Sequence, residues 1–270
     1  MSQVRAIVLA GNGINCEMET AHACKMAGAD EVHIVYLWDL AAGDASLDGY
    51  QLLCFPGGFL DGDDLGSARA SAIRLRHTSI NGESLLDQLR RYVERGGLAL
   101  GICNGFQLMI KLGLLPALAG RVGEPQATLT NNDSGRFEDR WVTLRTDPAS
   151  PCIFTKGMDV LELPVRHGEG KIVAPDDVMN AIRDQHLAPL SYIDPATGEA
   201  TETWPLNPNG SRYGLAALTD PTGRLFGLMP HPEAFLHRTN HPRWTREERP
   251  DEGDGLILFC NAVNYIRSNF

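Results

Sequence analysis

The sequence predicts an α/β fold with an open, mainly parallel sheet covered by helices on both faces, and with additional strands in its second half. Up to about residue 115, short apolar runs alternate with helical segments, and glycines separate several of them. This alternation is typical of βαβ units. Beyond about residue 126, strand-like runs and turns replace it, until a helical segment closes the chain.

The strands expected in the first half are short, apolar, rich in β-branched residues and bounded by glycine or proline. They are residues 4–10 (VRAIVLA), 31–38 (EVHIVYLW), 51–58 (QLLCFPGG) and 98–103 (LALGIC). Helices are expected at residues 16–28, 84–97 and 104–115. Gly28 and Gly96-Gly97 stand where helices commonly end.

The second half is expected to form strands and turns within residues 128–146, 159–175, 191–193, 214–220 and 224–230, and a helix over residues 254–270. Residues 204–211 and 239–255 are polar and contain prolines, which predicts loops. No linker, repeat or low-complexity tract interrupts the 270 residues. A single domain over residues 1–270 is therefore the simplest organisation.

The composition excludes several classes of protein. There are 24 basic and 34 acidic residues, so the formal net charge is −10. That balance argues against binding to nucleic acid or to an anionic membrane surface, which both require a basic face. No apolar run approaches the roughly 20 residues of a membrane span. We expect a soluble, cytoplasmic protein.

The six cysteines show neither zinc-site spacing nor a disulfide framework. No two of them form a CxxC pair, and a cytoplasmic chain of this length rarely uses disulfides. The default interpretation for each is a small buried apolar residue, with at most one or two chemically active.

Cys103 is the best candidate for a reactive cysteine. It lies between a predicted strand and a predicted helix, and Gly101 and Gly105 flank it at a spacing of two. A nucleophile at such a turn needs small neighbours, and the helix N-terminus favours a thiolate and can bind an oxyanion. A structural cysteine buried in a βα turn explains the same five residues equally well.

A thiol nucleophile needs a base and a group that orients the base. Two segments offer both, His167-Gly168-Glu169 and His231-Pro232-Glu233. In either one a bend is required, because alternate residues of an extended segment point to opposite sides. Pro232 restricts the histidine before it to extended geometry, and His231 follows a strand-like run. These observations favour His231 without excluding His167.

Together these motifs resemble those of the class I (triad) glutamine amidotransferases, and in particular the glutaminase subunits of phosphoribosylformylglycinamidine synthases. The narrower resemblance runs nearly end to end. It rests on residues 101–107 (GICNGFQ), 132–138 (NDSGRFE), 140–141 (RW), 167–170 (HGEG) and 229–233 (MPHPE). It implies a flavodoxin-like sheet. One departure is residues 59–63, which read FLDGD where the family usually has FSYGD.

The resemblance also implies roles for single residues. Cys103 is expected to be the nucleophile, His231 its base and Glu233 the orienting group. The candidate oxyanion hole consists of the backbone N–H groups of Gly58 and Asn104, and the candidate glutamine contacts are Gly57 and Gln107. For His167, Glu169 and Arg136 we hypothesise a role at an interface or in coupling to a partner.

The implied reaction is hydrolysis of L-glutamine through a cysteine thioester. The ammonia is expected to pass to a large synthetase subunit in purine (IMP) biosynthesis, with a small bridging subunit in the complex. No cofactor or metal is expected in this chain, whereas the synthetase uses ATP and Mg²⁺. The alternatives are a triad amidotransferase serving a different acceptor, a cysteine peptidase or chaperone-like protein, and an inactive partner-binding module. Extra length near residues 196–211 and 237–253 has no assigned role.

Overall fold

The computed structural model describes residues 3–80 and 82–270. Its central sheet has six strands in the spatial order β2-β1-β3-β6-β13-β12. They span Glu31–Tyr36, Arg5–Ala10, Leu52–Phe55, Leu98–Ile102, Leu225–Leu228 and Ala217–Thr219. The first five are parallel, and the edge strand β12 is antiparallel to β13. This order is that of a flavodoxin-like sheet with an added antiparallel edge, so the predicted fold class is confirmed.

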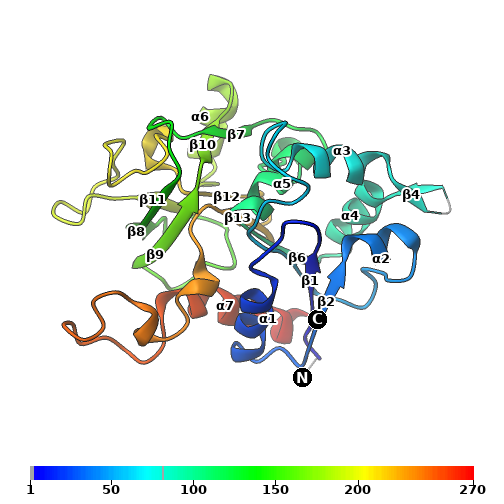
Figure 1. The fold of residues 1–270 in the computed structure, drawn as a ribbon, viewed down its shortest axis with the longest axis horizontal. Coiled ribbons are helices and arrows are strands. Elements are labelled where there is room, and N and C mark those ends of the chain that lie inside the picture. The colour runs from blue at the N-terminus through cyan, green and yellow to red at the C-terminus, as the bar shows by residue number, and fades with distance from the viewer. Residues whose placement is uncertain (1–2, 81) are drawn as a thin grey trace.

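Helices cover both faces of this sheet (Figure 1). Helices α1 (Glu17–Met26) and α7 (Asp254–Asn269) pack together on one face. Helices α3 (Arg69–His77), α4 (Leu85–Glu94) and α5 (Asn104–Leu112) lie on the other. The strand order explains the two faces, because the chain moves in opposite directions from β1 to β2 and from β3 to β6, and crossovers between parallel strands are right-handed as a rule.

The second half builds a further layer beside the central sheet (Figure 1). Strands β8 (Glu138–Thr146), β9 (Val160–His167) and β11 (Leu190–Tyr192) form an antiparallel sheet in the order β11-β8-β9. Strand β7 (Thr128–Asn131) pairs with β10 (Glu169–Val173). Helix α6 (Asp176–Asp184) follows β10, and short 3₁₀ turns are Leu118–Gly120, Arg212–Gly214, Pro232–Ala234 and Arg238–Asn240.

The structure corrects the predicted elements at several places. The strand expected over residues 31–38 ends at Tyr36, and Leu37 begins helix α2 (Leu37–Ala42), where it and Leu40 are buried. Helices α3 and α6 and the small hairpin of β4 (Ser79–Ile80) and β5 (Glu83–Ser84) were not predicted. Helix α3 is rich in arginine. The residue before it, Ala68, has a left-handed backbone conformation and provides no side-chain cap, so neither an apolar pattern nor a capping residue marks the helix in the sequence.

The predicted loops at residues 204–211 and 239–255 are present, and both are anchored to the body of the protein. Asn207 and Asn209 are buried in the first loop. In the second, the His241 ring is fully buried against Trp141 and Phe235. In the part of the chain that the structure describes, no helix is both long enough and apolar enough to span a bilayer.

The parallel strands β1, β3, β6 and β13 end at one edge of the sheet. The connections that follow them therefore meet there, although they are far apart in the sequence. They contain Cys16 after β1, Gly57-Gly58 after β3, Cys103 after β6 and His231 after β13. This edge is where the candidate site lies.

Candidate active site

Cys103 occupies a strained turn between β6 and α5. Its backbone has φ 50° and ψ −104°, and its N–H donates to the carbonyl of Leu228 at 2.8 Å. Such conformations are rare for residues other than glycine and occur mainly at functional sites. The turn is crowded: a Cβ at Gly105 would lie 1.9 Å from the carbonyl oxygen of Phe55, and one at Gly101 would lie 2.5 Å from the sulfur of Met109. Only glycine fits at either position.

His231 and Glu233 form a buried pair. Nδ1 of His231 lies 2.6 Å from Oε1 of Glu233, and the His231 backbone N–H donates to the carbonyl of Pro164 at 2.8 Å. The 3₁₀ turn over Pro232–Ala234 supplies the bend that lets the glutamate reach its own histidine. Burial lowers the pKa of His231, but the charge of Glu233 and the contact with Cys103 outweigh it and raise that pKa well above its usual value.

Cys103 and His231 share one cavity of about 120 Å³. The other lining residues are Asn15, Cys16, Gly58, Phe59, Phe137 and Arg166. The thiol of Cys103 contacts the carbonyl oxygen of Arg166 at 3.4 Å. Among the described residues, Nε2 of His231 has no hydrogen-bond partner although it is buried. The cavity thus holds a thiol beside an imidazole nitrogen that is free to exchange a proton.

The Gly57-Gly58 turn lies against this cavity and requires both glycines. A Cβ at Gly57 would lie 2.8 Å from Cε1 of His231, and one at Gly58 would lie 2.5 Å from the carbonyl oxygen of Gly13. Gly58 also has φ 149°. Asn104 is the first residue of α5, so its N–H has no acceptor within the helix. These two positions are the donors expected for an oxyanion hole.

Comparison with known proteins fits this geometry. The family model for a CobB/CobQ-like glutamine amidotransferase domain matches residues 3–266. The chain belongs to the glutamine amidotransferase family.

The similarity to individual known proteins covers nearly the whole of this amidotransferase. The chain is 42% identical to "Phosphoribosylformylglycinamidine synthase subunit PurQ" of Dehalococcoides mccartyi, covering 99% of both chains. It is 38% identical to "Phosphoribosylformylglycinamidine synthase" of Drosophila melanogaster, covering 98% of this chain and 20% of that one. Its structure matches a chain in the structure of PurLQS from Thermotoga maritima with a TM-score of 0.71, 28% identity and 98% and 100% coverage of the two chains.

Asn104 and Gln107 use their side chains within the amidotransferase itself. Asn104 Oδ1 accepts from the N–H of Leu60 at 3.0 Å, and its Nδ2 donates to Oε1 of Gln107 at 2.9 Å. Gln107 Nε2 donates to the carbonyl of Glu169 at 2.6 Å. These bonds tie the 57–60 loop, helix α5 and strand β10 together. Gln107 does not line the Cys103 cavity, and its predicted contact with glutamine stays a prediction.

The three residues assigned to coupling lie in different environments. The His167 ring is buried, its Nδ1 lies 3.0 Å from Oδ1 of Asn132, and burial and the nearby His231 lower its pKa to about 3. Glu169 is half-buried and accepts from the N–H of Ser67 at 3.2 Å. Arg136 is exposed. His167 therefore backs the active site, and of these three only Arg136 lies fully at the surface.

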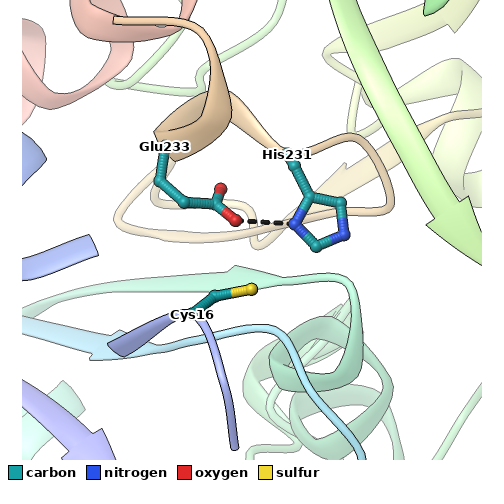
Figure 2. Close-up of side chains that lie close together, drawn as sticks. All are labelled: Cys16, His231 and Glu233. Atoms are coloured by element: carbon teal, nitrogen blue, oxygen red, sulfur yellow. Dashed lines mark hydrogen bonds and ion pairs between the residues drawn. The ribbon is translucent and has the colours of Figure 1, made fainter. Parts of the chain in front are cut away.

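Cys16 is the site residue that the sequence analysis missed. The structure brings it beside His231 and Glu233, so that one ligand atom from each of the three lies within 4.8 Å of the others (Figure 2). Burial raises the pKa of its thiol, although a hydrogen bond to His231 acts in the opposite direction. A signal was available, because Cys16 follows β1 at the same edge of the sheet as Cys103.

Proposed function

We propose that this chain is the glutaminase subunit of a phosphoribosylformylglycinamidine synthase. The cavity that Cys103 shares with His231, whose ring is paired with Glu233, carries the proposal. The 42% identity to a subunit of that name over nearly the full length supports the particular complex. The whole chain, residues 1–270, acts as one amidotransferase domain in the cytoplasm.

Cys103 begins the reaction as a thiolate that attacks the side-chain carbonyl carbon of L-glutamine. The C–N bond breaks, His231 gives its proton to the leaving nitrogen, and ammonia departs from a glutamyl thioester on Cys103. His231 then takes a proton from water, which attacks the thioester and releases glutamate and the thiol. The raised pKa of His231 keeps the imidazolium available for the first proton transfer.

Glu233 and the backbone donors support these steps. Glu233 holds the imidazole through Nδ1 and stabilises its charged form, so that Nε2 is the atom that transfers protons. The N–H groups of Gly58 and Asn104 stabilise the negative oxygen of each tetrahedral intermediate. Gly57 allows the turn to approach the His231 ring, and Gln107 positions the loop that carries Gly58.

The ammonia passes to a separate synthetase subunit, with a small bridging subunit in the assembly. A solved structure named PurLQS contains a chain similar to this one over its full length, which supports an assembly of this kind. The synthetase uses ATP and Mg²⁺ to convert formylglycinamide ribonucleotide to the amidine, whereas this chain carries no cofactor. Arg136, at the surface, and the half-buried Glu169, which lines a neighbouring pocket together with it, are candidates for coupling.

The proposal is tested with Cys103→Ala assembled with its synthetase. Glutamine-dependent formation of the amidine should fall to background, while turnover with added ammonium salt should persist, because only the ammonia source is removed. Cys260 is a half-buried thiol on α7 outside the cavity. The variant Cys260→Ala is therefore the matched control and should leave both rates unchanged. Undiminished glutamine-dependent turnover in Cys103→Ala would refute the assignment.

A further inference from the structure

Cys16 places a second thiol in the catalytic cavity, and the hydrolysis of glutamine as proposed does not use it. It precedes α1 and lines the same cavity as Cys103. Figure 2 shows its sulfur pointing into the space beside the His231–Glu233 pair, from the segment that follows β1. Its Sγ is 3.2 Å from Oδ1 of Asn15. The cavity therefore presents the Cys16 thiol and the His231 imidazole from two separate segments, and the carboxylate of Glu233 is paired with that imidazole.

We propose that Cys16, His231 and Glu233 form a binding site for a thiophilic divalent cation, with Zn²⁺ as the expected ion, and that the bound ion blocks glutamine hydrolysis. Cysteine, histidine and glutamate are the side chains that bind zinc in proteins. The bound ion inhibits the enzyme because it occupies His231, the base that the reaction needs. It is not a cofactor of the reaction.

The positions of the three ligand atoms suit one small ion. Zinc bonds of about 2.0–2.3 Å place two donor atoms roughly 3.3–3.8 Å apart around a tetrahedral ion. The three candidate donors already lie within 4.8 Å of one another. The His231–Glu233 contact of 2.6 Å is shorter than a donor–donor spacing. The ion therefore replaces the proton between these two groups, and the carboxylate moves outward by a fraction of an ångström.

An unpaired polar atom at the cluster points to a ligand as well. Oε2 of Glu233 is buried, and in the described residues it has no hydrogen-bond partner. The side chains of His231 and Glu233 are 4% and 1% exposed. Leaving a carboxylate oxygen buried without a partner is unfavourable, and a cation beside it would remove that cost.

Access and charge also permit an ion at this site. The cavity of about 120 Å³ reaches Cys16 and His231, and one water-sized particle needs only about 30 Å³. Arg166 faces the same cluster, with Nη2 4.0 Å from Oε1 of Glu233. Its side chain is 41% exposed, so it can turn into solvent when an ion arrives. Binding releases the Cys16 thiol proton and the proton shared by His231 and Glu233.

The direct test measures zinc binding to the full chain without the nucleophile, so that Cys103 cannot act as a ligand. Cys103→Ala is titrated with Zn²⁺ in competition with a chromogenic chelator, under reducing conditions and at slightly alkaline pH, because the ligands must lose their protons. We expect one zinc ion per chain. This arm does not depend on the proposed function.

The double variant Cys103→Ala/Cys16→Ser decides whether Cys16 is a ligand. Serine keeps nearly the same volume, so packing is preserved while the thiolate is lost. Even outer partners of a metal site contribute about 10- to 100-fold in affinity, so we expect binding to weaken at least 100-fold. Cys103→Ala/Cys260→Ser is the matched control and should bind as Cys103→Ala does. Co²⁺ should give a thiolate-to-metal absorption band in Cys103→Ala and not in the Cys16 double variant.

Two results would overturn the site. One is equal zinc affinity in Cys103→Ala and in the Cys16 double variant, and the other is no binding to Cys103→Ala at all. Inhibition is read separately in the assembled enzyme, with each rate normalised to its own metal-free rate. Zinc should inhibit the Cys16→Ser enzyme at least tenfold less potently than the wild type. Equal potency would assign the inhibition to Cys103 and contradict a regulatory role for Cys16.

Discussion

Nδ1 of His231 lies 2.6 Å from Oε1 of Glu233, two residues further along the chain, in a pair almost completely shielded from solvent. The turn through Pro232 makes this contact possible. It also determines the state of the imidazole, because burial alone would lower the pKa of His231, whereas the carboxylate charge raises it.

Replacing that charge should slow the reaction and move its pH profile. In Glu233→Gln the shape is kept, but burial then dominates and the pKa of His231 falls. We expect the glutaminase kcat to drop about 10²- to 10⁴-fold and the alkaline limb of kcat/KM to move to lower pH. Steady-state rates across pH test this, with the exposed Glu199→Gln as control. An unshifted limb would show that Glu233 does not set the protonation of His231.

His167 should make the protein sensitive to acid. The folded pKa is about 3 because burial and His231 oppose its charge, whereas an unfolded histidine titrates near about 6.5. The unfolded state therefore binds a proton first. Stability is present above about pH 6.5 and is lost as the pH falls toward 3, by at most about 1.4 kcal/mol per pH unit.

The substitution His167→Gln removes this titration. Urea unfolding at several pH values should give a shallower dependence of the unfolding free energy on pH across that window. The comparison uses slopes, so a constant loss of stability from the substitution itself does not affect it. An identical slope in both proteins would mean that His167 is not the group responsible.

The glycines of the Cys103 turn should differ sharply from the glycine of the HGEG segment. In Gly105→Ala the new Cβ would lie 1.9 Å from the carbonyl oxygen of Phe55, so α5 and β3 must separate. We expect a loss of about 3 kcal/mol or more in unfolding free energy. At Gly168 the nearest atom is a side-chain carbon of Phe137 at 3.9 Å, and Gly168→Ala should change stability by less than about 0.5 kcal/mol. Similar losses in both would contradict the packing argument.

Glu169 should matter for coupling. Its carboxylate accepts the N–H of Ser67 and so holds the loop that follows Gly58 against β10. In Glu169→Ala we expect glutamine-dependent turnover of the assembled complex to fall about tenfold, since a hydrogen bond to a charged group contributes about 1.5–3 kcal/mol. Ammonia-dependent turnover should be retained.

Glu169→Gln is the matched variant for this experiment, because its amide oxygen still accepts the Ser67 N–H. It should recover most of the glutamine-dependent rate. If alanine and glutamine behave alike, the negative charge matters more than the hydrogen bond. If Glu169→Ala couples normally, the carboxylate has no part in communication between the subunits.

The local geometry around the candidate catalytic residues could be predicted from the sequence, because it depends on residues that are close together along the chain. Gly101 and Gly105 around Cys103 predict a crowded turn, and Pro232 between His231 and Glu233 marks a bend. Alternating apolar runs predict a parallel sheet and the edge at which its loops gather. The resemblance to the amidotransferases then favoured His231 over His167 as the base.

The tertiary structure decided what depends on contacts between distant segments. No spacing along the chain brings Cys16 to His231, because they lie on connections after different strands that meet only when the sheet forms. The same holds for His167, for which we hypothesised a role at an interface or in coupling, and whose ring is buried. Helix α3 likewise lacks an apolar pattern and a cap, and it forms because α4 and α5 pack against it. The sequence by itself thus determined the sheet and the turn that holds Cys103, and only folding determined which other groups share its cavity.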